Sequence, residues 1–267
     1  MNEIETAAAA IRDADALLIG AGAGMGVDSG LPDFHGSEGF WRAYPAFRGK
    51  SFQDMADPSW FDRDPAQGWG FYGHRLHLYR DTEPHAGFQI LRGWAACKPS
   101  FVFTSNVDGH FQRAGFDEAD VVECHGSIHH LQCIAPCRSR VWSADACEVA
   151  VDEPTFRAIS ALPRCSDCGR GARPNILMFG DGCWVPSRTY SQRDRYDAWC
   201  GDQVESGARV VAIEMGAGSA IPTVRHACER GAQVVIRINP RDCVVRPGDI
   251  ALPMGALSAL TAIDACL

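Results

Sequence analysis

The sequence of 267 residues has neither a long apolar run nor a cluster of basic residues. A helix that crosses a bilayer needs about 20 consecutive apolar residues, and no stretch of this chain approaches that length. The first ten residues are acidic and rich in alanine, whereas a signal peptide begins with basic residues and continues with an apolar stretch. We therefore predict a cytoplasmic protein with no membrane partner.

Basic residues are also too few for a general nucleic-acid binder. The chain has 25 lysines and arginines against 33 acidic residues, which gives a net charge of -8. Binding to a phosphate backbone depends on clustered lysine and arginine, so we expect no nucleic-acid partner. The sequence also lacks internal repeats and low-complexity tails, and its hydrophobic content of 46% is ample for a folded core.

What the chain does contain is a short apolar run that leads directly into glycines. Residues 16–19 have the length of a buried strand, and Gly20, Gly22, Gly24 and Gly26 follow at alternate positions. Glycine lets the backbone bring its N–H groups close to a pyrophosphate. The ordinary dinucleotide fingerprint needs a further glycine where Met25 or Val27 stands. The stretch predicts a phosphate-binding loop unlike that of a plain dehydrogenase, although alone it is equally compatible with a glycine-rich turn.

Polar side chains follow two other predicted strands at the point where each strand ends. Asn106 and Asp108 come just after the strand at 100–104, and His125 follows the strand at 120–123. Ligands of open α/β sheets bind at the carboxyl ends of the strands, so Asn106 and Asp108 are candidate binding residues. Because imidazole titrates near neutral pH, His125 is a candidate general base.

The remaining apolar runs complete an α/β pattern. Further strands are predicted at 173–179, 208–215 and 232–238, and helices at 3–13, 66–79, 81–96, 223–230 and 252–266. Strands that alternate with helices and end in glycine or polar residues favour a parallel, doubly wound sheet. We therefore predict an α/β fold built on a doubly wound parallel sheet.

Four of the twelve cysteines form two close pairs, Cys133 with Cys137 and Cys165 with Cys168. In a reducing compartment such pairs indicate metal ligands rather than disulfides. Four thiolates can close a tetrahedron around a structural Zn²⁺ and leave no open position for catalysis. Cys147 lies between the pairs and is an alternative ligand.

The predicted helix at 66–79 carries Tyr72 and, three residues later, Arg75. Taken alone, this is an amphipathic helix with a solvated arginine. The long segment before the helix, with its aromatic patch and its prolines, is typical of a lid over a ligand.

Six motifs in this order resemble those of the sirtuins of bacterial type, which are NAD-dependent protein deacylases. They are GAGMGVDSGLPDF at 22–34, TSNVD at 104–108, HGS at 125–127, the two cysteine pairs, FGD at 179–181, and a glycine-serine turn followed by IN at 238–239. The resemblance implies a fold with two domains: a Rossmann-type NAD-binding domain from 1–37, 91–127 and 173–267, and a smaller zinc-binding and helical domain. It also implies a helical lid and acyl-pocket segment at 38–90 and a zinc-binding module at 128–172.

The resemblance implies roles for individual residues as well. His125 is the base, Asn106 and Asp108 hold the nicotinamide end, and acyl-lysine proteins are the substrates, which yield nicotinamide, 2′-O-acyl-ADP-ribose and free lysine. Phe179 and Gly180 correspond to the main chain that pairs with the substrate peptide. The implied NAD contacts are Gly22, Ala23, Gly24, Gly26, Asp33, Phe34, His35, Ser105, Gly216, Ser219 and Asn239.

The Tyr72 and Arg75 pair resembles the sirtuin subclass that prefers succinyl and malonyl groups, because a cation and a hydroxyl in an acyl pocket would bind a terminal carboxylate. Other positions depart from the family pattern: His35 stands in place of arginine, Gly26 in place of serine and Ser105 in place of glutamine. These departures keep two alternatives open. One is an NAD glycohydrolase or mono-ADP-ribosyltransferase, and the other is a non-catalytic sensor of NAD or ADP-ribose.

Overall fold

The computed structural model describes residues 2–32 and 36–267. Its largest element is a six-stranded parallel sheet in the order β11-β10-β9-β1-β2-β3. The strands are β1 (Ala16–Ala21), β2 (Ser100–Thr104), β3 (Val121–Glu123), β9 (Val210–Met215), β10 (Val234–Ile238) and β11 (Ile250–Leu252). The strand order reverses beside β1, which makes the crevice between the ends of β1 and β9 the topological switch point. The predicted doubly wound α/β sheet is confirmed.

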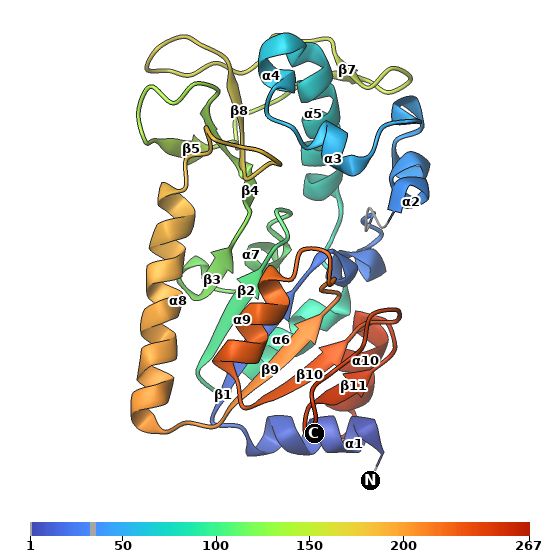
Figure 1. Cartoon of the computed structure of the whole chain (residues 1–267), viewed down its shortest axis with the longest axis vertical. Coiled ribbons are helices and arrows are strands. Elements are labelled where there is room, and N and C mark those ends of the chain that lie inside the picture. The colour runs from blue at the N-terminus through green and yellow to red at the C-terminus, as the bar shows by residue number, and fades with distance from the viewer. Residues whose placement is uncertain (1, 33–35) are drawn as a thin grey trace.

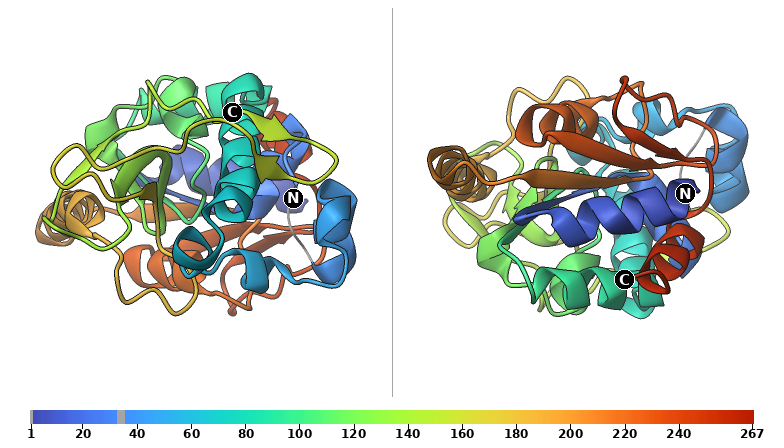
Figure 2. Two further views of the ribbon diagram at one scale, coloured as in Figure 1. Left: turned by 90° about the horizontal axis from the view of Figure 1, so that it is seen from above. Right: turned by 90° about the horizontal axis from the view of Figure 1, so that it is seen from below.

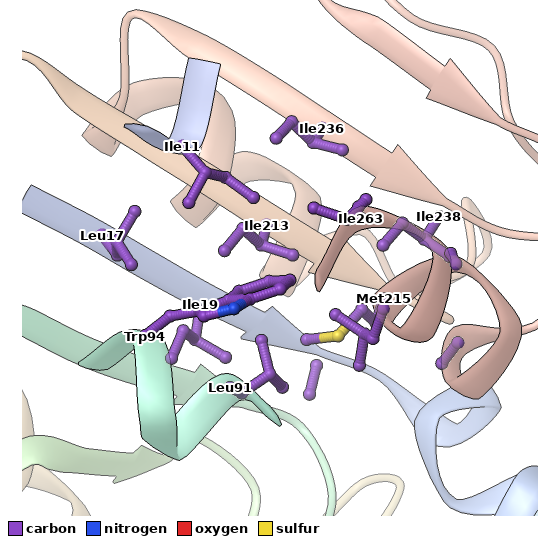
Figure 3. Close-up of a cluster of buried hydrophobic side chains, with 14 of the residues drawn as sticks. Ile11, Leu17, Ile19, Leu91, Trp94, Ile213, Met215, Ile236, Ile238 and Ile263 are labelled. Atoms are coloured by element: carbon purple, nitrogen blue, oxygen red, sulfur yellow. The ribbon is translucent and has the colours of Figure 1, made fainter. Parts of the chain in front are cut away.

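Helices cover both faces of this sheet, because successive side chains of a strand point to opposite sides. One face packs on α1 (Glu3–Asp13), α6 (Ala86–Ala95) and α10 (Ala256–Asp264), and Figure 3 shows Leu17 and Ile19 of β1 among the side chains of this core. The other face, with Leu18, packs on α8 (Ser187–Ser206) and α9 (Thr223–Gly231). Figure 2 shows these two helix layers from above and below.

A smaller part of the chain stands over the carboxyl ends of the strands (Figure 1). It contains a three-stranded antiparallel sheet, β5-β4-β8, and a two-stranded one, β6-β7. These strands are β4 (Gly126–Cys133), β5 (Val141–Ser143), β6 (Val151–Asp152), β7 (Arg157–Ala158) and β8 (Ala172–Ile176). The helices are α2 (Gly36–Ala43), α3 (Phe52–Met55), α4 (Trp60–Arg63) and α5 (Pro65–Asp81). Their own core is aromatic, with the rings of Tyr44 and Phe71 5.0 Å apart.

Short helical segments complete the chain. They are η1 (Ala23–Ser29), η2 (Pro45–Phe47), α7 (His110–Arg113) and η3 (Glu118–Asp120). Both termini lie at the end of the molecule opposite the smaller part (Figure 1). Among the described residues, no helix combines the length and the apolar character that crossing a bilayer requires.

Two elements differ from what the sequence predicts. The strand predicted at 173–179 does not join the parallel sheet, because β8 pairs antiparallel with β4. Its apolar run is compatible with either sheet, and only its pairing partner distinguishes them. The long helix α8 was not predicted, since its composition is polar and only Thr189, Gln192 and Tyr196 are buried. A helix with so few apolar positions gives little periodic signal.

Candidate functional site

A cavity of about 1020 Å³ lies between the end of the parallel sheet and the smaller part. Its wall includes the glycine loop after β1, the loops after β2, β3, β9 and β10, helix α5, and residues 176–181. The predicted residues that line it are Gly22, Ala23, Gly24, Gly26, Tyr72, Arg75, Ser105, Asn106, Asp108, His125, Phe179, Gly180, Gly216, Ser219 and Asn239. Asp33, Phe34 and His35 lie outside the described residues. The structure thus brings all the described binding and catalytic candidates to one cavity.

At the switch point, glycines of two loops touch directly. The Gly24 N–H donates to the Gly216 carbonyl at 3.1 Å. A Cβ atom on Gly22 would lie 2.6 Å from the Gly216 oxygen, and one on Gly24 would lie 2.6 Å from the Gly216 Cα. Gly216 itself has φ +59, a backbone conformation that glycine adopts without strain. Glycine at these positions therefore lets the two loops pack directly against each other, and both loops line the cavity. Open α/β sheets bind a pyrophosphate at glycine-rich strand ends of this kind, so these residues fit NAD.

The loop after β3 holds His125 half-buried at the cavity wall. Burial lowers the pKa of the imidazole below its ordinary value, and a hydrogen bond with the Ser105 backbone opposes part of this shift. A ring N–H that donates to a carbonyl leaves the second ring nitrogen with its lone pair available. His125 is therefore neutral near pH 7 and can accept a proton.

The loop after β2 ties the sheet to the glycine loop. The Asn106 Nδ2 donates to the Gly22 carbonyl at 3.0 Å. Asp108 is buried, and its Oδ1 accepts from the His110 N–H at 2.9 Å. Both side chains are thus held in fixed positions in the wall of the cavity, which His125 also lines.

Helix α5 contributes three polar side chains to the cavity, of which sequence reasoning identified Tyr72 and Arg75 but not Tyr79. Arg75 is only 5% exposed, so the simpler interpretation of a solvated arginine is wrong. Its Nη2 donates to the Tyr79 hydroxyl at 2.7 Å. Tyr79 follows Arg75 by four residues and so lies on the same helix face, which is the signal that could have identified it.

The Tyr72 hydroxyl is buried and has no hydrogen-bond partner among the described residues. Burial raises the pKa of Tyr72 to about 12, which keeps the phenol protonated and able to donate. Arg75 adds a cation beside it, with the guanidinium carbon 5.5 Å from the Tyr72 ring centre. This end of the cavity is therefore suited to a group that accepts hydrogen bonds.

The turn at 178–181 is held by a buried ion pair. The Arg173 Nη2 lies 2.8 Å from the Asp181 Oδ1, and both side chains are almost fully buried. The N–H of Phe179 donates to the Ala56 carbonyl at 2.9 Å. A peptide that pairs along this segment would use its other main-chain groups or displace Ala56.

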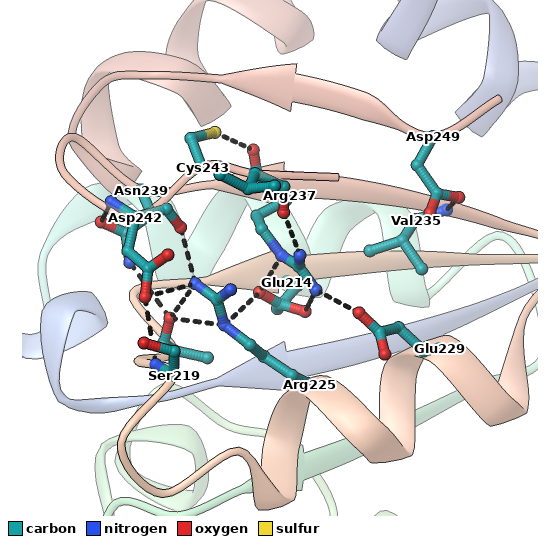
Figure 4. A network of polar contacts seen from close by, with 12 residues as sticks. Glu214, Ser219, Arg225, Glu229, Val235, Arg237, Asn239, Asp242, Cys243 and Asp249 are labelled. Carbon is teal, nitrogen blue, oxygen red and sulfur yellow. Dashed lines mark hydrogen bonds and ion pairs between the residues drawn. The ribbon is translucent and has the colours of Figure 1, made fainter. Parts of the chain in front are cut away.

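At the other end of the cavity, a polar network holds the loop after β9 and the loop after β10 together (Figure 4). The Asn239 Nδ2 donates to the Ala217 carbonyl at 3.1 Å, and the Ser219 N–H donates to the Asp242 carboxylate at 3.1 Å. Arg225 bridges both loops, with its Nη2 3.0 Å from the Ala217 oxygen and 3.1 Å from the Asp242 carboxylate. Asn239 and Ser219 thus have structural partners. Asp242 and Arg225 were not identified from the sequence. They lie on different elements from Ser219, and only the fold brings the three residues together.

The four paired cysteines meet away from the cavity. Their sulfur atoms all lie within 4.8 Å of one another, and the Cys133–Cys168 and Cys137–Cys165 sulfur pairs are each 3.7 Å apart. Zn–S bonds of about 2.3 Å in a tetrahedron separate sulfurs by about 3.8 Å. Cys147 is not in this group and is instead buried in the core of the smaller part. The cluster fits a structural Zn²⁺ with the predicted ligands.

Comparisons with known proteins find matches over most of the chain. A family model described as "Sir2 family" matches residues 22–197. The NAD-dependent protein deacylase of Aquifex aeolicus is 30% identical over 83% of this chain and 82% of its own length. That of Thermus thermophilus is 28% identical over 97% of this chain and 93% of its own length. That of Methylococcus capsulatus is 33% identical, but the match spans 65% of this chain and 64% of that protein.

Solved structures of similar fold cover almost the whole chain. A Sir2 homologue mutant in complex with ADP-ribose superimposes with a TM-score of 0.73 at 22% identity, covering 100% of this chain and 96% of that one. A Sir2 homologue in complex with NAD has a TM-score of 0.71 at 24% identity, with coverage of 98% and 93%. At identities this low, the structural similarity establishes the shared fold and nothing further.

Proposed function

The chain belongs to the Sir2 family, and from this premise we propose that it is an NAD-dependent protein deacylase. It removes acyl groups from protein lysines and yields nicotinamide, 2′-O-acyl-ADP-ribose and free lysine. One observation carries the proposal: a single cavity contains the bare glycine loops, Asn106, Asp108 and His125. The division into an NAD-binding domain, a helical lid and a zinc-binding module is part of the same proposal.

Each group in the cavity has a task in this reaction. NAD, when bound, supplies a ribose carbon whose bond to nicotinamide can be broken. The glycine loops let the pyrophosphate approach the backbone, and Asn106 with Asp108 orients the nicotinamide end. His125 accepts a proton from the ribose hydroxyls, since burial keeps its imidazole neutral. Holding both substrates in one cavity contributes by proximity and orientation.

Nicotinamide release from NAD tests this proposal. We expect release only when an acetyl- or succinyl-lysine peptide is present, together with an equal amount of free-lysine peptide, in protein shown to contain zinc. An unmodified peptide of the same sequence is the control. Release without any peptide would indicate NAD hydrolysis, label transferred from NAD to protein would indicate ADP-ribosyl transfer, and binding without release would indicate a sensor. Each of these three results contradicts deacylation.

We further propose that the enzyme prefers acyl groups with a terminal carboxylate, such as succinyl and malonyl. Support comes from the buried Tyr72 hydroxyl and from the Arg75 cation, which Tyr79 orients within the same cavity. A carboxylate would accept charge-assisted hydrogen bonds from these donors, whereas an acetyl group offers no acceptor at its end.

Arg75→Met should therefore lower kcat/KM for a succinyl peptide by about 10- to 100-fold, because a hydrogen bond to a charged group contributes about 1.5–3 kcal/mol. Activity on the acetyl peptide should change much less. The matched control is Arg63→Met, which removes an exposed arginine from α4. Equal losses on both peptides would show that Arg75 supports the fold and does not select the acyl group.

A further inference from the structure

Glu123 is the last residue of β3 and stands two positions before His125. Three residues of α8 bind it. The Glu123 N–H donates to the Gln192 Oε1 at 3.1 Å, and the Glu123 carbonyl accepts from the Thr189 Oγ1 at 3.2 Å. Its carboxylate forms an ion pair with the Arg188 Nη2 at 2.6 Å. Helix α8 therefore contacts Glu123 through its backbone N–H, its backbone carbonyl and its side chain.

These contacts are buried. The Glu123 side chain is 1% exposed and that of Arg188 is 13% exposed. A buried ion pair is costly to desolvate, and an apolar pair of the same size is often as stable or more so. The two preceding residues of β3, Val121 and Val122, are indeed apolar. The ion pair between Glu123 and Arg188 is therefore better explained by its holding the chain in position than by a gain in net stability.

The chain that leaves Glu123 leads directly to the base. The Cys124 N–H donates to the Thr104 carbonyl at 2.8 Å, and the His125 carbonyl accepts from the Leu177 N–H at 2.9 Å. Leu177 belongs to the wall of the cavity, and the same stretch of chain continues into α8 at Ser187. Helix α8 stands at the side of the molecule and reaches from the smaller part along the sheet (Figure 1). Helix α8 therefore anchors both the strand end that leads to His125 and the chain that follows residues 176–181, where we propose that the substrate peptide pairs.

We propose that Glu123, held by Arg188, Thr189 and Gln192, is a positioning residue that places the imidazole of His125 against the Ser105 carbonyl and toward the cavity. The inference rests on the proposed function insofar as His125 is the base of the reaction. Its consequence is that α8 controls the proton-transfer step that follows nicotinamide release. Binding of NAD, which involves the glycine loops, does not depend on it.

Glu123→Gln tests the proposal, since it keeps the size of the side chain and removes its charge. We expect kcat for free-lysine formation to fall about tenfold, because displacements of about 1 Å at a reacting group can cost up to 10²-fold. The KM for NAD, and the peptide-dependent exchange of labelled nicotinamide into NAD, should stay within about twofold. Exchange only requires that nicotinamide leaves and returns, before the base acts.

Two further variants complete the design. Thr189→Val is nearly isosteric and removes only the hydroxyl that donates to the Glu123 carbonyl. It should lower kcat for free-lysine formation about threefold and leave nicotinamide exchange unchanged, so it tests the proposal even if Glu123→Gln folds poorly. Glu118→Gln is the matched control, because Glu118 pairs with the same Arg188 at 2.7 Å but its side chain is 59% exposed. It should leave both reactions unchanged.

A second readout needs no NAD. In the wild-type protein, ¹⁵N chemical shifts of the His125 ring should show one neutral tautomer, and Glu123→Gln should give a mixture while Glu118→Gln does not. An unchanged tautomer, or equal losses of exchange and deacylation, would show that Glu123 has only a structural role. Absence of acyl-dependent nicotinamide release in the wild type would contradict the proposed function instead, and the ring shifts would still decide the placement of His125.

Discussion

His125→Ala should lower kcat for deacylation by about 10²- to 10⁴-fold, the usual contribution of a positioned general base. The KM for NAD should change little, because the glycine loops are untouched. Free-lysine peptide, measured by mass spectrometry, reports the loss. His226→Ala, which removes an exposed histidine from α9 outside the cavity, is the matched control. A His125→Ala enzyme with more than a tenth of wild-type activity would contradict the role of His125 as base.

The pH dependence of kcat gives the same assignment a second check. The base works in its neutral form, and burial holds the pKa of His125 below the ordinary histidine value of about 6.5. Activity should therefore decline only as the pH falls through a value below 6.5, and His125 should cause no change between pH 7 and 8. A fall in kcat on acidification that is centred above pH 7 would show that another group is the base.

Cys165→Ser should abolish zinc binding and destabilise the smaller part. Cys165 is buried, and its sulfur lies 3.7 Å from that of Cys137 within the four-cysteine cluster. Losses of structural metals belong to the largest single-residue effects, about 4–5 kcal/mol. For a protein of this size we expect the melting temperature to fall by about 10–20 °C. Activity should be lost indirectly, because the cavity wall at 176–181, where we propose that the peptide binds, follows directly from β8 of the smaller part.

Zinc content per chain, measured by mass spectrometry of the metal, and thermal melting test this prediction together. Cys183→Ser is the matched control, since Cys183 is exposed and lies outside the cluster. It should retain one zinc per chain and the wild-type melting temperature. A Cys165→Ser protein that is folded, zinc-loaded and fully active would overturn the assignment of the ligands.

The sequence by itself determined the features that depend on neighbouring residues. The apolar run at 16–19 leads into glycines, and the structure shows a buried strand followed by a bare backbone loop. Two cysteine pairs of short spacing predicted the four-sulfur cluster. Asn106, Asp108 and His125 could be predicted at one site, because the carboxyl ends of parallel strands meet at one edge of the sheet.

Only the tertiary structure decided which segments meet. The run at 173–179 has strand character whichever sheet it joins, and β4 alone places it in the antiparallel one. The burial of Arg75 depends on the rings of Phe52, Phe71 and Tyr79, two of which lie on α5 beside it while Phe52 comes from α3. The hold of α8 on Glu123 joins residues about 70 positions apart, in a helix whose polar composition gave no periodic signal. Periodicity and spacing record local geometry. Burial and partner choice arise from contacts between segments that are distant in the chain, and these contacts decide the surroundings of His125 and of Arg75.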